Sequence, residues 1–158
     1  DALAISTIKR RKFSKLDFKK FHPSGTLGAK LKTVKELMYT GRNIPFINEN
    51  SNIKTALKVF NKKNLGVLIA INKKKNTTGI ISDGDLKRIT YKSENINNLI
   101  IKKVMKKNPV KVNENLLAAE ALSIMNNKKI TALCVFKNKR KKISGLITMH
   151  KILNANIT

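Results

Sequence analysis

The pattern of hydrophobic and polar positions occurs twice along the chain. Each half opens with a short extended segment after a proline, at 46–47 and at 110–112. A segment with apolar residues three and four positions apart follows, and this spacing predicts an amphipathic helix in each half. The apolar residues are Ile53, Ala56, Leu57 and Phe60 in the first half, and Leu117, Ala121, Leu122 and Met125 in the second.

Each predicted helix is followed by a hairpin and a last helix. Apolar runs separated by a polar turn indicate the two strands of a hairpin. The strands are predicted at 67–71 and 79–81 in the first half, and at 132–136 and 145–147 in the second. Ser82 and Thr148 follow, and a hydroxyl side chain is a favoured helix N-cap. The predicted order is β-α-β-β-α in both halves, which gives an α+β fold class.

Residue identities also repeat at a nearly constant offset. Asn48-Glu49-Asn50 recurs as Asn113-Glu114-Asn115. Gly79-Ile80-Ile81-Ser82 recurs, at almost the same separation, as Gly145-Leu146-Ile147-Thr148. A fixed period of this kind indicates an internal duplication. We therefore assign the two repeats to 34–92 and 99–158, after an N-terminal segment at 1–33.

Length and composition limit the classes of protein. The 158 residues suffice for about one domain, and 41% of them are hydrophobic, which is enough for a packed core. Uncharged apolar runs such as 67–71 are far shorter than the roughly 20 residues of a membrane span. Cys134 is the single cysteine, so no disulfide or zinc site is expected and a reducing cytoplasm is favoured. We expect no metal and no cofactor.

The net charge of +25 has three interpretations. A basic surface of this strength binds nucleic acid by releasing counterions from phosphates. However, lysine far outnumbers arginine among the basic residues, and Lys, Asn and Ile, which A/T-rich codons encode, are all abundant. Codon drift is therefore favoured over nucleic-acid binding, and attraction of a small anionic ligand is the third interpretation. The clusters of basic residues at 73–75 and 139–142 fall on the two predicted hairpin turns, so we expect them to be solvated loop tips.

The duplicated β-α-β-β-α unit with its Gly-x-x-Ser/Thr ending resembles a tandem CBS (cystathionine-β-synthase-type) pair. The resemblance implies a regulatory module that binds adenosyl or other nucleotides in the clefts between its repeats. Three segments in order also resemble the C-terminal part of arabinose-5-phosphate isomerases. They are Asp1-Ala2-Leu3-Ala4, the stretch from His22 to Gly28, and the stretch from Ser82 to Arg88. In that family a sugar isomerase (SIS) domain precedes the CBS pair, so 1–33 is expected to be the end of a SIS domain.

The resemblance implies interconversion of D-ribulose 5-phosphate and D-arabinose 5-phosphate for the synthesis of Kdo, a sugar of lipopolysaccharide. It further implies a sugar phosphate substrate and a cytoplasmic homo-oligomer, either a dimer or a tetramer. His22 lies in a His-Pro-x-Gly segment and is the candidate catalytic residue, because imidazole is suited to proton transfer near neutral pH. A turn histidine without catalytic role is the alternative. The phosphate-binding loop and the main base are expected upstream, so this chain alone is predicted to be inactive.

The candidate ligand-binding residues are Ser82 and Asp85 in the first repeat, and Thr148, His150 and Lys151 in the second. Ser82 and Asp85 have the spacing of a capping box, and in CBS modules such an Asp also binds ribose hydroxyls. In the second repeat Lys151 stands where that Asp is expected, which favours a more anionic ligand there. The resemblance implies an AMP-like effector, and the place of the reaction in Kdo synthesis suggests a CMP-Kdo-like one. The alternatives are a free-standing adenosine-nucleotide module and a basic nucleic-acid-associated protein.

Overall fold

The structure, a computed structural model, describes residues 28, 31–92, 95–137 and 140–157. The first repeat consists of β1 (Phe46–Asn48), α5 (Ile53–Lys63), β2 (Val67–Ile71), β3 (Thr77–Ser82) and α6 (Asp83–Lys92). The second consists of β5 (Lys111–Asn113), α8 (Ala118–Lys128), β6 (Ala132–Phe136), β7 (Gly145–Thr148) and α9 (Met149–Leu153). The predicted order is confirmed, and β2 and β6 have the predicted bounds. The expectations for 1–27, including His22, lie outside the described residues.

Short elements that were not predicted lie ahead of the first strand of each repeat. α4 (Val34–Leu37) and the 3₁₀ turn η1 (Gly41–Asn43) precede β1. A second 3₁₀ turn, η2 (Ile96–Asn98), α7 (Ile101–Val104) and β4 (Lys106–Lys107) precede β5. The sheets have the orders β1-β2-β3-β4 and β5-β6-β7. In each sheet the first strand is parallel to the second, and the following strand forms the predicted hairpin with it.

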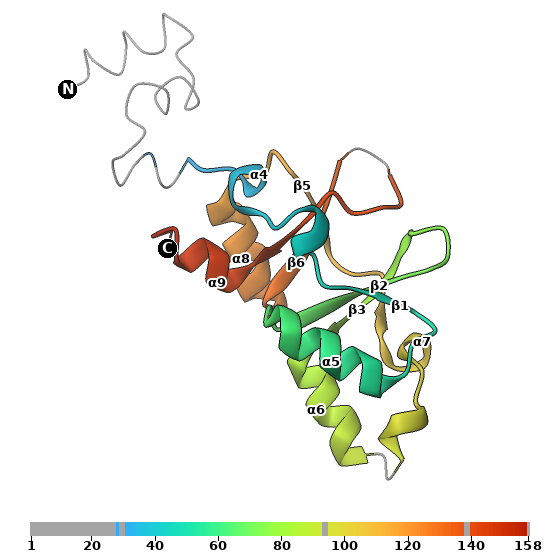
Figure 1. The fold of residues 1–158 in the computed structure, drawn as a ribbon. Coiled ribbons are helices and arrows are strands. Elements are labelled where there is room, and N and C mark those ends of the chain that lie inside the picture. The colour runs from blue at the N-terminus through green and yellow to red at the C-terminus, as the bar shows by residue number, and fades with distance from the viewer. Residues whose placement is uncertain (1–27, 29–30, 93–94, 138–139, 158) are drawn as a thin grey trace, which may run out of the picture.

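The central strands are buried on both faces because each sheet lies between helices and the other sheet. On β2, Leu68 and Ala70 join the core formed with α5, whereas Val67 and Ile69 face the other repeat. Val67 and Ile69 belong to the same buried cluster between the sheets as Cys134 of β6. Side chains alternate between the faces of a strand, so an unbroken apolar run is what two buried faces require. Figure 1 shows the two repeats meeting at their sheets, with α5 and α6 at one end and α8 and α9 at the other.

The leading segment of each repeat, which is the part ahead of its first strand, packs on the opposite repeat. Val34 of α4 donates its N–H to the Leu116 carbonyl of the second repeat at 2.8 Å. Ile101 of α7 donates its N–H to the Ser51 carbonyl of the first repeat at 2.9 Å. In Figure 1, α4 accordingly lies beside α8, while α7 lies at the first repeat. The two repeats are therefore tied together by an exchange of their leading segments.

Two ion pairs at equivalent positions accompany this exchange. Lys35 Nζ lies 3.3 Å from the Glu114 carboxylate, and Lys102 Nζ lies 3.6 Å from the Glu49 carboxylate. Both glutamates are more than nine-tenths buried and belong to the duplicated Asn-Glu-Asn motif. Buried carboxylates need such partners because desolvation otherwise destabilises them. The repeated motif thus marks where each leading segment docks.

The two repeated glycines allow the leading segments to approach closely. A Cβ on Gly79 would lie 2.5 Å from Met105 Sδ and 2.8 Å from the Lys106 carbonyl oxygen. A Cβ on Gly145 would likewise overlap the Met38 side chain. The glycine of the Gly-x-x-Ser/Thr ending is therefore required by close packing at this point.

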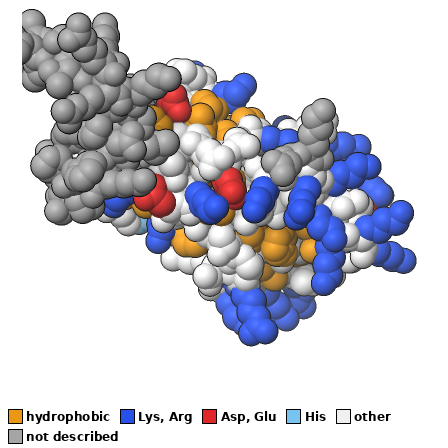
Figure 2. Space-filling model, turned by 90° about the horizontal axis from the view of Figure 1, so that it is seen from above, with side chains coloured by type: hydrophobic (Ala, Val, Ile, Leu, Met, Phe, Trp, Pro, Cys, Tyr) orange, Lys and Arg blue, Asp and Glu red, His pale blue; other side chains and the backbone are white. Residues whose placement is uncertain are grey.

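On the face seen in Figure 2, basic side chains are spread over the described residues, and acidic ones appear at few places. The two hairpin turns lie close together, since the Thr77 N–H donates to the Lys141 carbonyl at 3.1 Å.

Within the described part of the chain, no helix combines the length and the hydropathy needed to cross a bilayer.

Candidate functional site: two clefts between the repeats

The first cleft lies where the end of β3 and the start of α6 face the second repeat. It is a cavity of about 410 Å³. Its lining is Val67, Ile80, Ser82–Asp85, Arg88, Lys106–Val110 and Lys129–Ala132. Apolar walls with a few convergent polar groups are typical of a small-molecule site of this size. Both repeats and the segment between them therefore contribute to one cleft.

Ser82 and Asp85 form the predicted capping box at the start of α6. The Ser82 hydroxyl donates to Asp85 Oδ2 at 2.6 Å, and the Ser82 N–H donates to the same oxygen at 3.0 Å. In return, the Asp85 N–H donates to Ser82 Oγ at 3.3 Å. These bonds fix the carboxylate at the cleft wall, with one oxygen engaged by the cap and the other left for further partners.

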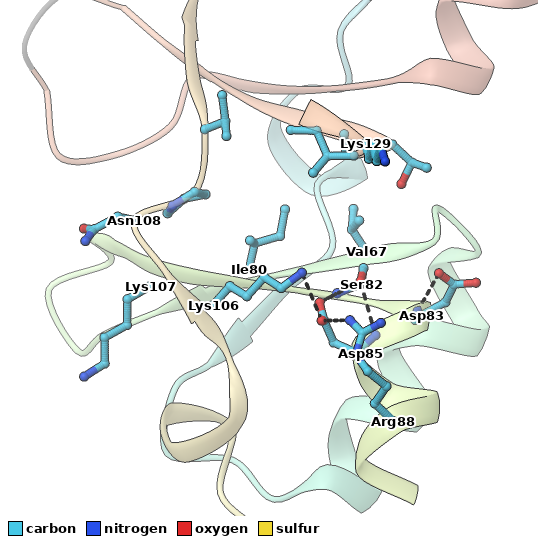
Figure 3. Close-up of a pocket in the computed structure, with 16 residues that line it drawn as sticks. Val67, Ile80, Ser82, Asp83, Asp85, Arg88, Lys106, Lys107, Asn108 and Lys129 are labelled. Atoms are coloured by element: carbon cyan, nitrogen blue, oxygen red, sulfur yellow. Dashed lines mark hydrogen bonds and ion pairs between the residues drawn. The ribbon is translucent and has the colours of Figure 1, made fainter. Parts of the chain in front are cut away.

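Two cations converge on the second oxygen of this carboxylate. Arg88 of α6 donates to Asp85 Oδ1, and Lys106 Nζ of β4 lies 3.1 Å from the same atom. Figure 3 shows the two side chains reaching Asp85 from separate elements. The Asp85 side chain is 9% exposed, whereas those of Arg88 and Lys106 are 60% and 61% exposed. The first cleft thus holds one buried carboxylate between two cations that extend into solvent.

Burial alone would raise the pKa of Asp85, but the hydrogen bonds outweigh it. The bonds from Ser82, Lys106 and Arg88 stabilise the ionised form and lower the pKa from 3.8 to about 2. Asp85 is therefore a carboxylate throughout the neutral range, able only to accept hydrogen bonds. A ligand that contacts it must supply donors, such as ribose hydroxyls.

The second cleft is the counterpart of the first under the internal duplication. It also has a volume of about 410 Å³. Its lining is Met38, Tyr39, Thr40, Asn43, Lys62, Lys63, Leu65 and Lys151. Tyr39 pairs with Leu146 of β7 as Lys106 pairs with Ile80 of β3, so Tyr39 and Lys106 occupy equivalent places.

The charged cluster of the first cleft is not reproduced in the second. Lys151 stands in place of Asp85, and Tyr39 in place of Lys106. Instead of an ion pair, Lys151 Nζ lies over the Tyr39 ring, 5.1 Å from its centroid, a cation–π contact. The carboxylate and the lysine of the ion pair in the first cleft are thus both replaced in the second, so the two clefts differ in charge.

Thr148 and His150 do not line the second cleft. Thr148 is buried and caps α9, where its hydroxyl accepts the Lys151 N–H at 3.3 Å. The exposed His150 ring lies 3.0 Å from the Asn154 side-chain nitrogen on the same helix. Of the five candidate ligand-binding residues, the described structure brings Ser82 and Asp85 to the first cleft and Lys151 to the second.

Arg88, Lys106 and Tyr39 were not predicted as site residues from the sequence. The i,i+3 spacing of Asp85 and Arg88 on α6 was a usable signal. Lys106 and Tyr39 reach their clefts only through the exchanged segments, which no local pattern shows. Among the described residues, no group of three or more acidic, His or Cys side chains is arranged to hold a metal ion.

Comparison with known proteins agrees with this architecture. The CBS domain family matches residues 34–91 and 101–157. An arabinose 5-phosphate isomerase, KdsD of Yersinia pestis, is 35% identical over 158 residues, which are 99% of this chain and 48% of that protein. The chain therefore spans about half the length of this curated relative, matching its C-terminal part.

Two solved structures share the fold at low identity. The crystal structure of CBSX2 in complex with AMP has a TM-score of 0.68 and 20% identity, covering 78% of this chain and 95% of that one. The CBS domain pair of MJ0100, in complex with 5'-methylthioadenosine and S-adenosyl-L-methionine, has a TM-score of 0.69 and 19% identity, covering 78% and 94%. Both likenesses concern the tandem arrangement of the repeats.

Proposed function

The chain belongs to the CBS domain family, and we propose that it is the regulatory module of a D-arabinose-5-phosphate isomerase and binds a nucleotide or nucleotide sugar in the first cleft. Ligand binding is supported above all by the cluster of Asp85, Arg88 and Lys106 at the wall of a cavity between the repeats. The similarity to isomerases over 48% of their length supports the enzymatic context.

The cluster suggests how a nucleotide is held. Ribose hydroxyls donate to Asp85 Oδ1, the oxygen that the helix cap leaves available. Lys106 and Arg88, which contact that oxygen in the structure, turn onto the phosphate, because both have exposed side chains that can follow it. Val67, Ile80 and neighbouring apolar residues line the wall for the base.

The remaining parts of the proposal concern the whole protein. A SIS domain upstream converts D-ribulose 5-phosphate to D-arabinose 5-phosphate for Kdo synthesis, with His22 at its active site. The enzyme acts in the cytoplasm as a homo-oligomer, and CMP-Kdo is the candidate feedback effector beside AMP. The chain of 158 residues has no isomerase activity by itself, which an assay with D-ribulose 5-phosphate tests.

The melting temperature of the chain tests ligand binding. AMP or CMP-Kdo at millimolar concentration should raise it, because a ligand at 100 times its Kd stabilises the folded state by about 2.7 kcal/mol. Asp85→Ala should abolish the increase. Glu120→Ala is the matched control, since Glu120 likewise caps the start of a helix, α8, but lines neither cleft, and it should keep the increase.

Two results would contradict the proposal. The absence of any increase with either ligand would exclude nucleotide sensing by this module. An increase that Asp85→Ala leaves unchanged would leave Asp85 as a helix cap alone. Binding of polynucleotide with a steep salt dependence, in place of either ligand, would support the nucleic-acid alternative.

A further inference from the structure

The second cleft is unlike the first because ammonium groups line it without a carboxylate. Lys62, Lys63 and Lys151 all border the cavity, and none of its lining residues is acidic. Among the described residues, neither Lys62 nor Lys151 forms an ion pair. Lys63 is satisfied by a backbone carbonyl, that of Arg42. Three cations at one cavity form an arrangement that an anion would stabilise.

The charge difference arises at positions that the duplication makes equivalent. In the first cleft, Asp85 neutralises part of the charge of Lys106 and Arg88. In the second, Lys151 replaces the carboxylate, Tyr39 replaces the lysine, and Asn154 stands at the position of Arg88. The second cleft has thus lost the acceptor for a ribose diol and gained a cation at the same point.

The second cleft also includes part of the leading segment. The Tyr39 backbone is fixed to β7, since its N–H donates to the Leu146 carbonyl at 2.8 Å and its carbonyl accepts the Leu146 N–H at 3.0 Å. Its ring, in contrast, is held by the Lys151 ammonium group. Thr40, the next residue, borders the same cavity. A ligand in this cleft therefore contacts the segment that leads into the first repeat.

We propose that the second cleft binds a phosphorylated small molecule through Lys151, Lys62 and Lys63, and that binding draws Lys151 away from the Tyr39 ring. Lysine binds phosphate as a point charge, and three lysines at one cavity match the concentrated negative charge of a phosphoryl group. We expect this ligand not to be a nucleotide, because the second cleft has no carboxylate to accept a ribose diol. This inference rests on the proposed function and deepens it by assigning a second, chemically different effector to the same module.

The tyrosine content of the chain allows a clean test. The chain has two tyrosines and no tryptophan, and Tyr91 is 90% exposed. In a Tyr91→Phe variant with ¹³C-labelled tyrosine, the NMR signal of the ring therefore reports on Tyr39 alone. Inorganic pyrophosphate, titrated at physiological ionic strength, should shift this signal to saturation. Citrate, which spreads a similar charge over three separate carboxylates, should bind more weakly than the compact pyrophosphate.

Two lysine substitutions in the Tyr91→Phe background locate the site. Lys151→Met keeps the aliphatic stem and removes the charge, so pyrophosphate affinity should fall about tenfold, as expected for one lost charge-assisted bond. Lys107→Met is the matched control, because Lys107 borders the first cleft at the position equivalent to Thr40. It should leave the titration unchanged. The circular dichroism melting curves of both variants verify that they fold.

Several results would overturn the inference. An unperturbed Tyr39 signal would show that no ligand acts on this contact. If Lys151→Met binds pyrophosphate as tightly as the Tyr91→Phe background does, Lys151 is not part of the site. If Lys107→Met loses as much affinity as Lys151→Met, pyrophosphate is attracted only by the overall positive charge of the chain. Binding of citrate as strong as that of pyrophosphate would refute phosphate selectivity. These outcomes do not depend on the nucleotide test, which depends on Asp85.

Discussion

The stability that Asp85 provides is a direct consequence of its surroundings. Its pKa is lowered from 3.8 to about 2, and at about 1.36 kcal/mol per pKa unit this corresponds to roughly 2 kcal/mol at neutral pH. Arg88 and Lys106 are more than half exposed, so salt screens part of this energy. Asp85→Asn keeps the shape of the side chain and an acceptor for the cap, but removes the charge. We expect it to lower the free energy of unfolding by about 2 kcal/mol at neutral pH and low salt.

The pH dependence distinguishes charge from shape. Above pH 4 the carboxylate is ionised in the folded and the unfolded chain, and its contribution is complete. As the pH falls from about 4 to about 2, the unfolded chain takes up the proton first, so the contribution is lost. Urea unfolding of wild type and Asp85→Asn across this range should therefore show a difference that shrinks toward zero near pH 2.

The exposed neighbour Asp83 provides the control for this measurement. Asp83 lies 4.0 Å from Lys87, and the two side chains are 57% and 74% exposed. Asp83→Asn should change the free energy of unfolding by less than about 1 kcal/mol at any pH, as exposed pairs do. Equal stability of Asp85→Asn and wild type at pH 7 would refute a stabilising role of the Asp85 charge, and so would a stability deficit that is as large at pH 2 as at pH 7.

Other substitutions and reagents test the packing. Gly79→Ala should lower the free energy of unfolding by about 1–3 kcal/mol in urea, because its methyl group overlaps Met105; a neutral effect would disprove the close approach. Cys134, whose pKa burial raises to about 12, should not react with a thiol reagent at pH 8 until urea unfolds the chain; rapid labelling of the native chain would contradict its burial. Glu49→Gln and Glu114→Gln should shift the urea midpoint equally, since both glutamates bind a leading segment; a clear inequality would count against equivalent docking.

The repeated core was predictable because its signal is local. The apolar run of β2 and the helical spacing in α5 are properties of adjacent residues, and the second repeat presented them again. The duplication therefore provided an independent copy of each prediction. Ser82 and Asp85 were found for the same reason, since a capping box is a local motif with a fixed spacing.

The clefts themselves were only partly predictable. Lys151 was identified because it departs from the pattern of the first repeat, but its partner Tyr39 lies in the other half of the chain. The two meet because the leading segment of the first repeat docks on the second. Lys106 reaches Asp85 by the equivalent route. Contacts of this kind are set by tertiary packing, which the sequence pattern of either segment does not contain.

The two clefts differ in the residues that would bind a ribose, and the number of bound nucleotides reveals this difference. Isothermal titration calorimetry of the chain with AMP measures the number of bound nucleotides. We predict one AMP per chain, bound in the first cleft, and none in Asp85→Ala, because the second cleft has lysine where the ribose would need a carboxylate. Two equal sites per chain, or one site that Asp85→Ala leaves intact, would contradict the account.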